Sequence, residues 1–343
     1  MKDLNIITLN KDKYHDWDMF VEQSPQGDIF CYSWWLEATT NSHFKIITVI
    51  ENGVMVAGIP IAYDKNGRIN EPFLTRTLGV LYKPQQQLSE HKQISNQRQW
   101  LNALLEELPL NNFVQMCFHH NFTDWLPLKW KGFKQTTKYT YIIGYNGKSI
   151  EDIWNGLNNL TKRIIAKAQK NAINVEISDD IKNLYNYVLL SYQRQGLTFN
   201  ISFEEFNRLD EAIKKNGKRI IFKASDNVGH IHSMLYFSFN AKSAYFLISG
   251  SDPQYREFGA FPLAMWEAIK HFYGKTEYFN FGGSVIEPIE RHFRGYGGTL
   301  TPYFHIFNDN LMTEENGLRY HAKQILFHCK KLNNILVKKI TGK

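Results

Sequence analysis

Residues 279–307 read FNFGGSVIEPIERHFRGYGGTLTPYFHIF, and an aromatic, a basic residue, a glycine and an aromatic follow one another at Phe293–Tyr296. The same order occurs at Trp130–Phe133, an offset of 293 − 130 = 163 residues. The match continues without a gap through 136–141 and 299–304. A match of this length, repeated so far along one chain, predicts a duplicated domain rather than a short solenoid repeat.

The segments upstream of the two matched stretches also repeat. FKIITVI-ENG-VMVAGIPIA at 44–62 and RIIFKAS-DNVG-HIHSMLYFSF at 219–239 each read as two strands joined by a turn. Asn-Gly is a strong hairpin signal, and Ser202 with Glu205 forms a capping-box pattern at a helix start. Between the copies, apolar residues of 149–172 fall on one face of a predicted helix.

Each copy therefore predicts a helix, a hairpin, a helix and a strand, which is typical of an α/β class with mixed sheets flanked by helices. We expect a first domain at 1–145, a second domain with the active site at 146–310, and a C-terminal basic helix at 311–343.

The tail from Arg319 to Lys343 contains seven basic residues and no acidic one, so it holds all of the net charge of +7. Its apolar residues recur at helical spacing. This pattern predicts an amphipathic helix that either packs on the body or contacts a membrane or nucleic acid.

Composition excludes several protein classes. With 43% apolar residues in 343, the chain can form two ordinary cores, and no stretch reads as a secretion signal or a membrane span. We therefore expect a cytoplasmic protein. Three cysteines, Cys31, Cys117 and Cys329, are too scattered for a disulfide framework or a zinc site, so we expect reduced, buried thiols and no metal.

The segment 279–307 resembles the signature near the end of the FemAB family, an Asp-Phe-Gly-Gly-Ser stretch before Phe-Lys and Phe-Gly-Gly. LTKRIIAKAQKNAINVEI and SYQRQG also resemble family motifs, and SWWLEATT, ENGVMVAGIPI and GFKQTTKYTYII stand in family order. The resemblance implies two GNAT-like domains and transfer of an amino acid from aminoacyl-tRNA, or of an acyl group, to an amine of an envelope precursor. Arg294 and Asn280 replace the family's Lys and Asp, and the long coiled-coil insertion is absent.

Acyl transfer needs a held carbonyl, donors for the developing oxyanion and a route for the amine proton. Arg294 is a candidate for binding an anionic group or the acyl oxygen, because a guanidinium stays protonated. Tyr296 and Tyr303 are candidate general acids, and Glu287 is the nearest carboxylate for a base. The same segment supplies further candidate binding residues, which are Asn280, Gly282, Gly283, Ser284 and Gly297.

A second group of candidates suits phosphate. YREFGAF at 255–261 approximates the GNAT phosphate loop, with Arg256, Gly259 and Ala260 before a helix whose N-terminus would hold a pyrophosphate. Arg163 and Lys167 lie on one predicted helix face, and Arg194 ends another helix. A solvated basic face explains Arg163 and Lys167, together with Lys170, equally well, and an ordinary helix entrance is the alternative for 255–261.

We therefore expect an acyltransferase that uses acyl-CoA, without a tightly bound cofactor, on an amine of an envelope or polysaccharide precursor. The expected partner is a phosphate-bearing or lipid-linked substrate, with peripheral contact at the inner membrane face through the tail. One alternative is a tRNA-dependent aminoacyl transferase on a peptidoglycan precursor. Another is a non-catalytic binding protein that retains the fold.

Overall fold

The computed structural model describes residues 4–108 and 114–308. The expected tail helix and Cys329 lie outside these residues. The first repeat comprises β1 (Leu4–Thr8), α1 (Tyr14–Gln23), α2 (Ser33–Thr40), β2 (Phe44–Glu51), β3 (Val54–Ala62), β4 (Leu81–Tyr82), α3 (Glu90–Glu106), β5 (Gln115–Cys117), α4 (Leu126–Trp130) and β6 (Lys134–Gly144).

The second half of the chain begins with two connecting helices, α5 and α6, and then repeats the order of the first. It comprises α5 (Ile150–Gly156), α6 (Asn159–Lys170), β7 (Asn174–Ser178), α7 (Ile181–Arg194), α8 (Phe203–Lys215), β8 (Arg219–Ser225), β9 (Ile231–Phe239), β10 (Ser243–Ser251), the short helix η3 (Pro253–Phe258), α9 (Ala260–Phe272), β11 (Tyr278–Asn280), α10 (Glu287–Arg294) and β12 (Thr299–Phe307). The duplication and the α/β class are confirmed, and the eight-stranded sheet is mixed because β10 and β11 pair parallel.

Local signals explain several of these elements. Asn52 and Gly53 have φ of 52° and 76°, so the predicted Asn-Gly turn joins β2 to β3. Both hydrogen bonds of the capping box form, with Ser202 Oγ accepting from Glu205 N at 3.2 Å and Glu205 Oε2 accepting from Ser202 N at 2.8 Å.

The single helix predicted over 149–172 is wrong, because the chain forms two helices there, α5 and α6. Asn158 separates them: its Oδ1 accepts from Thr161 N at 2.7 Å and caps the start of α6. Consequently Leu160, expected on the apolar face, is 57% exposed.

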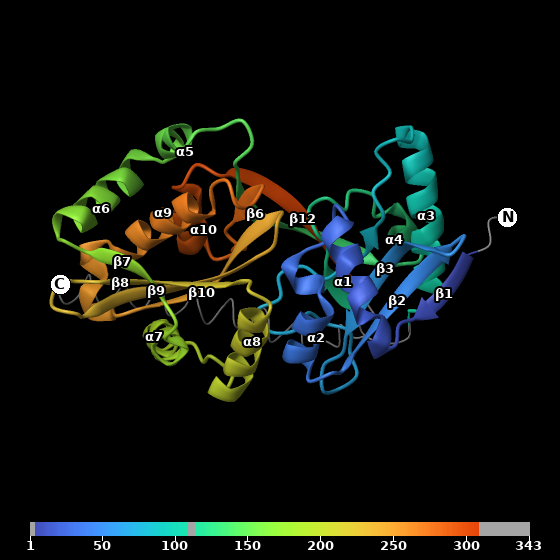
Figure 1. The fold of residues 1–343 in the computed structure, drawn as a ribbon, viewed down its shortest axis with the longest axis horizontal. Coiled ribbons are helices and arrows are strands. Elements are labelled where there is room, and N and C mark those ends of the chain that lie inside the picture. Colours follow the sequence, from blue (N-terminus) through green and yellow to red (C-terminus); the bar gives the residue numbers. More distant parts are fainter. Residues whose placement is uncertain (1–3, 109–113, 309–343) are drawn as a thin grey trace, which may run out of the picture.

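The sheets exchange strands between the repeats. A four-stranded sheet has the order β1-β2-β3-β4, and an eight-stranded sheet has the order β5-β12-β6-β11-β10-β9-β8-β7. In the described residues, β6 pairs antiparallel with β11 and β12 of the second repeat, while β12 pairs antiparallel with β5 and β6 of the first. The last strand of each repeat thus adds to the sheet of the other, and β6 and β12 connect the two halves (Figure 1). The domain limits at 145 and 310 remain predictions.

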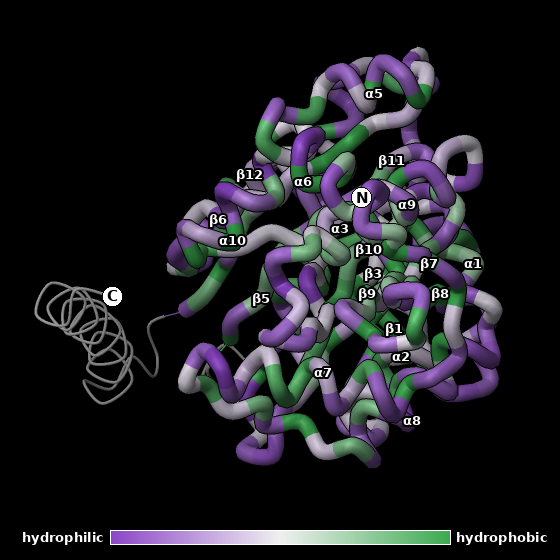
Figure 2. The backbone as a smooth tube through the Cα atoms, turned by 90° about the vertical axis from the view of Figure 1, so that its left-hand side faces the viewer, coloured by the Kyte–Doolittle hydropathy of each residue, from purple (hydrophilic) through white to green (hydrophobic). Residues whose placement is uncertain are grey.

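The repeats also share a core. One cluster packs α1 and α2 of the first repeat against α7, α8 and one face of the second repeat's sheet, and Phe30 meets Tyr245 edge-on at 4.8 Å between ring centroids. Figure 2 shows hydrophobic stretches around β9 and β10 in the middle of the molecule. This packing holds the two repeats together, so a side chain of one can lie in a site of the other.

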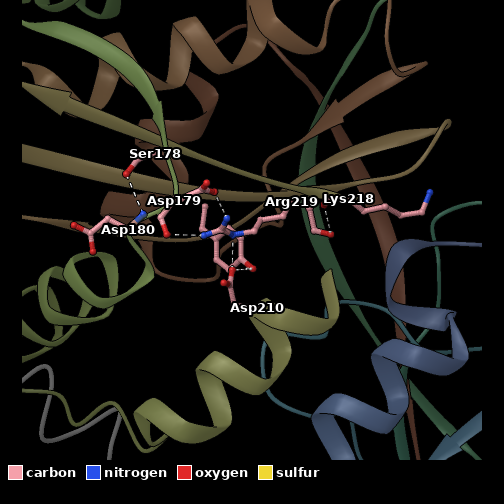
Figure 3. Close-up of polar contacts among 8 residues, drawn as sticks. Ser178, Asp179, Asp180, Asp210, Lys218 and Arg219 are labelled. Atoms are coloured by element: carbon pink, nitrogen blue, oxygen red, sulfur yellow. Dashed lines mark hydrogen bonds and ion pairs between the residues drawn. The ribbon is translucent and has the colours of Figure 1, made fainter. Parts of the chain in front are cut away.

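A buried ion pair fixes α8 to β8. Arg219 Nε lies 2.7 Å from Asp210 Oδ1, with exposed fractions of 5% and 1% for the two side chains. Arg219 Nη1 also lies 2.5 Å from Asp179 Oδ1 at the end of β7, as Figure 3 shows. Asp210 accepts a further hydrogen bond from Tyr236 at 2.6 Å, so its carboxylate is well compensated.

Cys31 and Cys117 are free and buried, as expected. Burial raises the pKa of each thiol to about 12, so both stay protonated near neutral pH. Among the described residues, no helix is both long and apolar enough to cross a bilayer.

Candidate functional site

The sheet of the second repeat opens between β10 and β11. These parallel strands pair only from Ser243–Tyr278 to Tyr245–Asn280, after which β10 continues to Ser251. A bulge follows at once, between Phe246 and Ile248, where β10 pairs with β9. Beyond Tyr245 the edge of β10 therefore no longer pairs with β11, and its carbonyl and amide groups are free for other partners.

A pocket lies at this opening, where the two repeats meet. It is an open hollow of about 240 Å³ that includes solvent space, and the part that water-sized molecules can occupy measures about 10 Å³. We call it the junction pocket, and its lining residues are Arg76, Thr77, His120, Thr140, Tyr245, Asn280, Gly282 and Tyr303. The first repeat and the second both contribute, because β6 and β12 are exchanged.

Asn280 shapes the floor of the junction pocket. Its Oδ1 accepts from Gly282 N at 2.9 Å and from Thr140 Oγ1 at 2.6 Å. Gly282 has φ of +75°, and a Cβ there would lie 3.2 Å from Arg76 Nε. Position 282 therefore needs glycine both for its backbone conformation and for the approach of Arg76.

Arg76 crosses from the first repeat to the open strand edge. Its Nη2 donates to the carbonyl oxygen of Leu247, the residue at the β10 bulge, at 2.8 Å. Burial lowers the pKa of Arg76 from its ordinary value, but a guanidinium remains charged near neutral pH. The pocket consequently contains a positive charge that belongs to the opposite repeat.

Two titratable side chains complete the wall. Burial lowers the pKa of His120 to about 4, so its imidazole is neutral near pH 7. Burial also raises the pKa of Tyr303, which keeps its hydroxyl protonated. A neutral imidazole and a phenol in one pocket can accept and donate a proton, respectively.

A buried carboxyl supports the pocket from behind. Asp28 accepts from Thr77 Oγ1 at 3.0 Å and from Ser243 Oγ at 3.3 Å, and Tyr245 also donates to it. Burial raises the pKa of Asp28. This network fixes Thr77 and Tyr245, so two walls of the junction pocket are held by hydrogen bonds to Asp28.

At the far end of β10 the chain reaches the expected phosphate loop. Gly259 has φ of +77° and precedes α9, and a Cβ there would collide with Ile164 of α6. Ala260 is the first residue of α9, where free backbone amides favour an anion. Burial and the nearby Arg256 cation lower the pKa of Arg194, so α7 and η3 bring two guanidinium groups to this loop.

Arg163 and Lys167 are exposed on α6, the helix that packs against Gly259. The structure thus gathers Arg194, Arg256, Gly259 and Ala260 around the start of α9, with α6 beside them.

The remaining candidates lie on and around α10, outside the lining of the junction pocket. Arg294 is 61% exposed and 3.6 Å from Glu290, and Glu287 pairs with Arg291 at 2.9 Å. Tyr296 is fully buried, with its hydroxyl 3.3 Å from His292 Nε2. Ser284 Oγ accepts from Ile286 N at 3.1 Å.

Two of the glycines near α10 contact protein backbone. A Cβ at Gly283 would collide with the carbonyl of Tyr139, and one at Gly297 with that of Gly156. Close packing inside the protein therefore requires small residues at both positions.

The junction pocket combines three expected residues, Asn280, Gly282 and Tyr303, with five that sequence reasoning missed. The missed residues are Arg76, Thr77, His120, Thr140 and Tyr245. Arg76 and His120 both lie in irregular segments without a motif. Their sequence context contains no signal for this site.

His230 and His232, at the start of β9, share one hydrogen-bond partner, Asp226. Their ring nitrogens lie 3.0 and 3.3 Å from Asp226 Oδ2, and Tyr255 stacks on both rings. The described residues include no cluster of three or more histidine, cysteine, aspartate or glutamate side chains that could hold a metal.

Comparison with known proteins finds relatives by structure. No family model and no curated protein sequence matches the chain. FemX superposes with a TM-score of 0.68 at 14% identity, over 88% of this chain and 96% of that one. A tandem GNAT protein from the clavulanic acid biosynthesis pathway gives 0.51 at 9% identity, over 89% and 98%.

A GNAT-family acetyltransferase from Colwellia psychrerythraea gives a TM-score of 0.50 at 13% identity, over 88% of this chain and 98% of that one. Each of the three structures aligns over nearly its whole length, so the similarity extends over both repeats and the exchanged strands between them. The chain has the FemX-like double GNAT fold.

Proposed function

We propose that this protein is an acyltransferase that moves an acyl group from a thioester donor of the acyl-CoA type to an amine of an envelope or polysaccharide precursor. The observation that carries the proposal is the opening of β10 from β11 beside the junction pocket, on the strand from which the chain runs through η3 to the basic start of α9. A donor with a diphosphate at one end and a thioester at the other fits such a path. The named relatives support acyl transfer through their fold.

The chemistry needs no nucleophilic side chain. The amine nitrogen attacks the acyl carbon, a C–N bond forms, the C–S bond breaks, and the amine proton leaves while the thiolate gains one. In this proposal His120 accepts the amine proton, and the thiolate takes a proton from solvent. Hydrogen-bond donors in the pocket stabilise the oxyanion of the tetrahedral intermediate.

Native mass spectrometry of the full chain tests the donor. We expect a one-to-one complex with acetyl-CoA or a longer acyl-CoA. A complex with aminoacyl-tRNA alone would favour the tRNA-dependent alternative, and a complex with neither would overturn both enzyme readings. Binding of neither donor would favour the third alternative, a non-catalytic binding protein that retains the fold.

Variants then test the phosphate end of the donor and, separately, Arg294 on α10, outside the junction pocket. Arg256→Ala should raise KM for acyl-CoA about tenfold, because a charge-assisted contact is worth about 1.5–3 kcal/mol. Arg294→Ala should lower transfer by about an order of magnitude on the same grounds, with the melting temperature nearly unchanged. Arg68→Ala, which removes an ion pair with Asp64 in the first repeat, is the control. Unchanged kinetics in Arg256→Ala or Arg294→Ala would remove that residue from the site.

A lipid-linked acceptor would place the enzyme at a membrane surface. The basic tail from Arg319 to Lys343 would bring the enzyme to an anionic membrane surface, where each basic residue contributes about 1 kcal/mol. Sedimentation with anionic liposomes should therefore retain the full chain and not a chain that ends at Gly317. Equal retention of both chains contradicts this role.

A further inference from the structure

Arg76 in the junction pocket has an unpaired charge. Its Nη2 is bonded to Leu247, but its Nε is buried without any hydrogen-bond partner. Within the described residues, no carboxylate lies within ion-pair distance of this guanidinium. A buried donor without an acceptor costs about 1–3 kcal/mol, and a charged one costs more. This arrangement makes the Arg76 guanidinium a strong anion-binding group.

Two neutral donors lie beside it in the pocket lining. The amide of Asn280 has a fixed orientation, because Gly282 N and Thr140 Oγ1 both donate to its Oδ1. Its Nδ2 therefore points away from them and donates to no group of the part of the chain described. The hydroxyl of Tyr303 is likewise without a hydrogen-bond partner among residues 4–108 and 114–308. Three donors thus line one pocket without internal acceptors.

The charges of the lining residues select the ligand. Arg76 carries the only formal charge among them, because His120 is neutral near pH 7 and the others do not ionise there. A singly charged, planar carboxylate balances one guanidinium and accepts several N–H and O–H bonds. A doubly charged phosphate would leave one charge uncompensated in a largely buried place.

We infer that the junction pocket is a carboxylate-binding subsite, in which Arg76, Asn280 and Tyr303 hold the carboxylate of the acceptor. Arg76 bonds the bulge of β10, the same strand edge where the acyl group would lie under the proposed function, on which this assignment to the acceptor rests. The acceptor would therefore be an amine that carries a carboxylate near the reacting nitrogen. The first repeat supplies the recognising charge and the second repeat supplies the strand edge, so neither repeat alone forms this subsite.

The Nε–H of Arg76 gives a direct test in the full chain. Its ¹⁵N–¹H signal, assigned by its loss in Arg76→Lys, should shift saturably with acetate and stay in place with acetamide, the neutral isostere. A ligand of so few atoms binds with a Kd on the order of millimolar, so the titration should extend to about ten times that range. No shift, or an equal shift with acetamide, would overturn the carboxylate subsite. A shift with inorganic phosphate but not with acetate would overturn it as well.

Two conservative variants that should fold normally give a second test of acetate binding. Tyr303→Phe removes one donor without changing volume and should weaken acetate binding about fivefold, as expected for a neutral hydrogen bond of about 1 kcal/mol. Arg68→Lys should leave acetate binding unchanged. Unaltered acetate affinity in Tyr303→Phe would exclude this hydroxyl and contradict the three-donor site.

Acyl-CoA binding separates the two proposals. Arg76→Lys should bind acyl-CoA as the wild type does, because the donor's diphosphate lies at the start of α9. Acetate binding without any acyl-CoA binding would preserve the subsite and defeat the proposed function. Acyl-CoA binding without a response to acetate would support the proposed function and overturn the carboxylate subsite.

Discussion

Single residues determine the charge of the candidate site. Asn280 is buried and bonded to Gly282 and Thr140, so a neutral amide stands on the pocket floor where a carboxylate would have neutralised Arg76. From the sequence the same position is a candidate binding residue and a departure from the family that the segment resembles. Its effect on the site becomes visible when Arg76, about 200 residues earlier in the chain, is found in the same pocket.

Asp18 should make stability depend on pH. Burial raises its pKa to about 6, although Ser33 N and Oγ donate to its carboxylate. The folded state therefore binds a proton more tightly than the unfolded chain, and stability falls as pH rises from about 4 to above 6. For this partly exposed group we expect a loss of about 2 kcal/mol that Asp18→Asn removes.

Urea unfolding of both proteins across this pH range checks the prediction. The difference in their free energies of unfolding isolates Asp18 from the other carboxylates. Parallel pH profiles for the wild type and Asp18→Asn would show that the carboxylate is not penalised in the fold.

At the scale of elements, the attachment of α8 to β8 depends on the Arg219–Asp210 pair. Arg219→Ala should lower the free energy of unfolding by about 3–5 kcal/mol, because it leaves a buried carboxylate without its cation. Asp179 is the other partner of Arg219, and the Asp179 side chain is 81% exposed. Asp179→Ala should therefore lower the free energy of unfolding by less than about 1 kcal/mol. Denaturant titration of the two variants measures both values. Equal losses would mean that burial does not decide the strength of these contacts.

At the scale of the whole molecule, the exchanged strands make the repeats interdependent. Residues 1–145 alone would leave β6 without β11 and β12, and the remainder of the chain alone would leave β11 without β6. Open strand edges favour aggregation. We expect each half to aggregate when expressed alone and the two halves to purify together as a one-to-one complex when co-expressed. Two halves that are each soluble, monomeric and cooperatively folded would contradict this interdependence.

The sequence by itself determined the elements and their duplication. The Asn52-Gly53 turn, the capping box of Ser202 and Glu205, and the apolar strand segments beside the turns depend on neighbours within a few residues, so their signals are local. The same holds for the segment around Asn280 and Gly282, whose hydrogen bond spans two residues. The single helix predicted over 149–172 was wrong, but the signal that divides it is also local, because Asn158 caps the start of α6 through Thr161, three residues away.

Only the tertiary structure decided where the repeats exchange strands and which residues meet in the junction pocket. Strand pairing depends on which edges remain free after folding, and the sequences of β6 and β12 alone do not specify their partners. Arg76, His120 and Tyr303 approach one another because that exchange brings the repeats together, with more than 200 residues between the first and the last. No pattern within either repeat encodes such a convergence, since it arises from the shared core and from long-range hydrogen bonds.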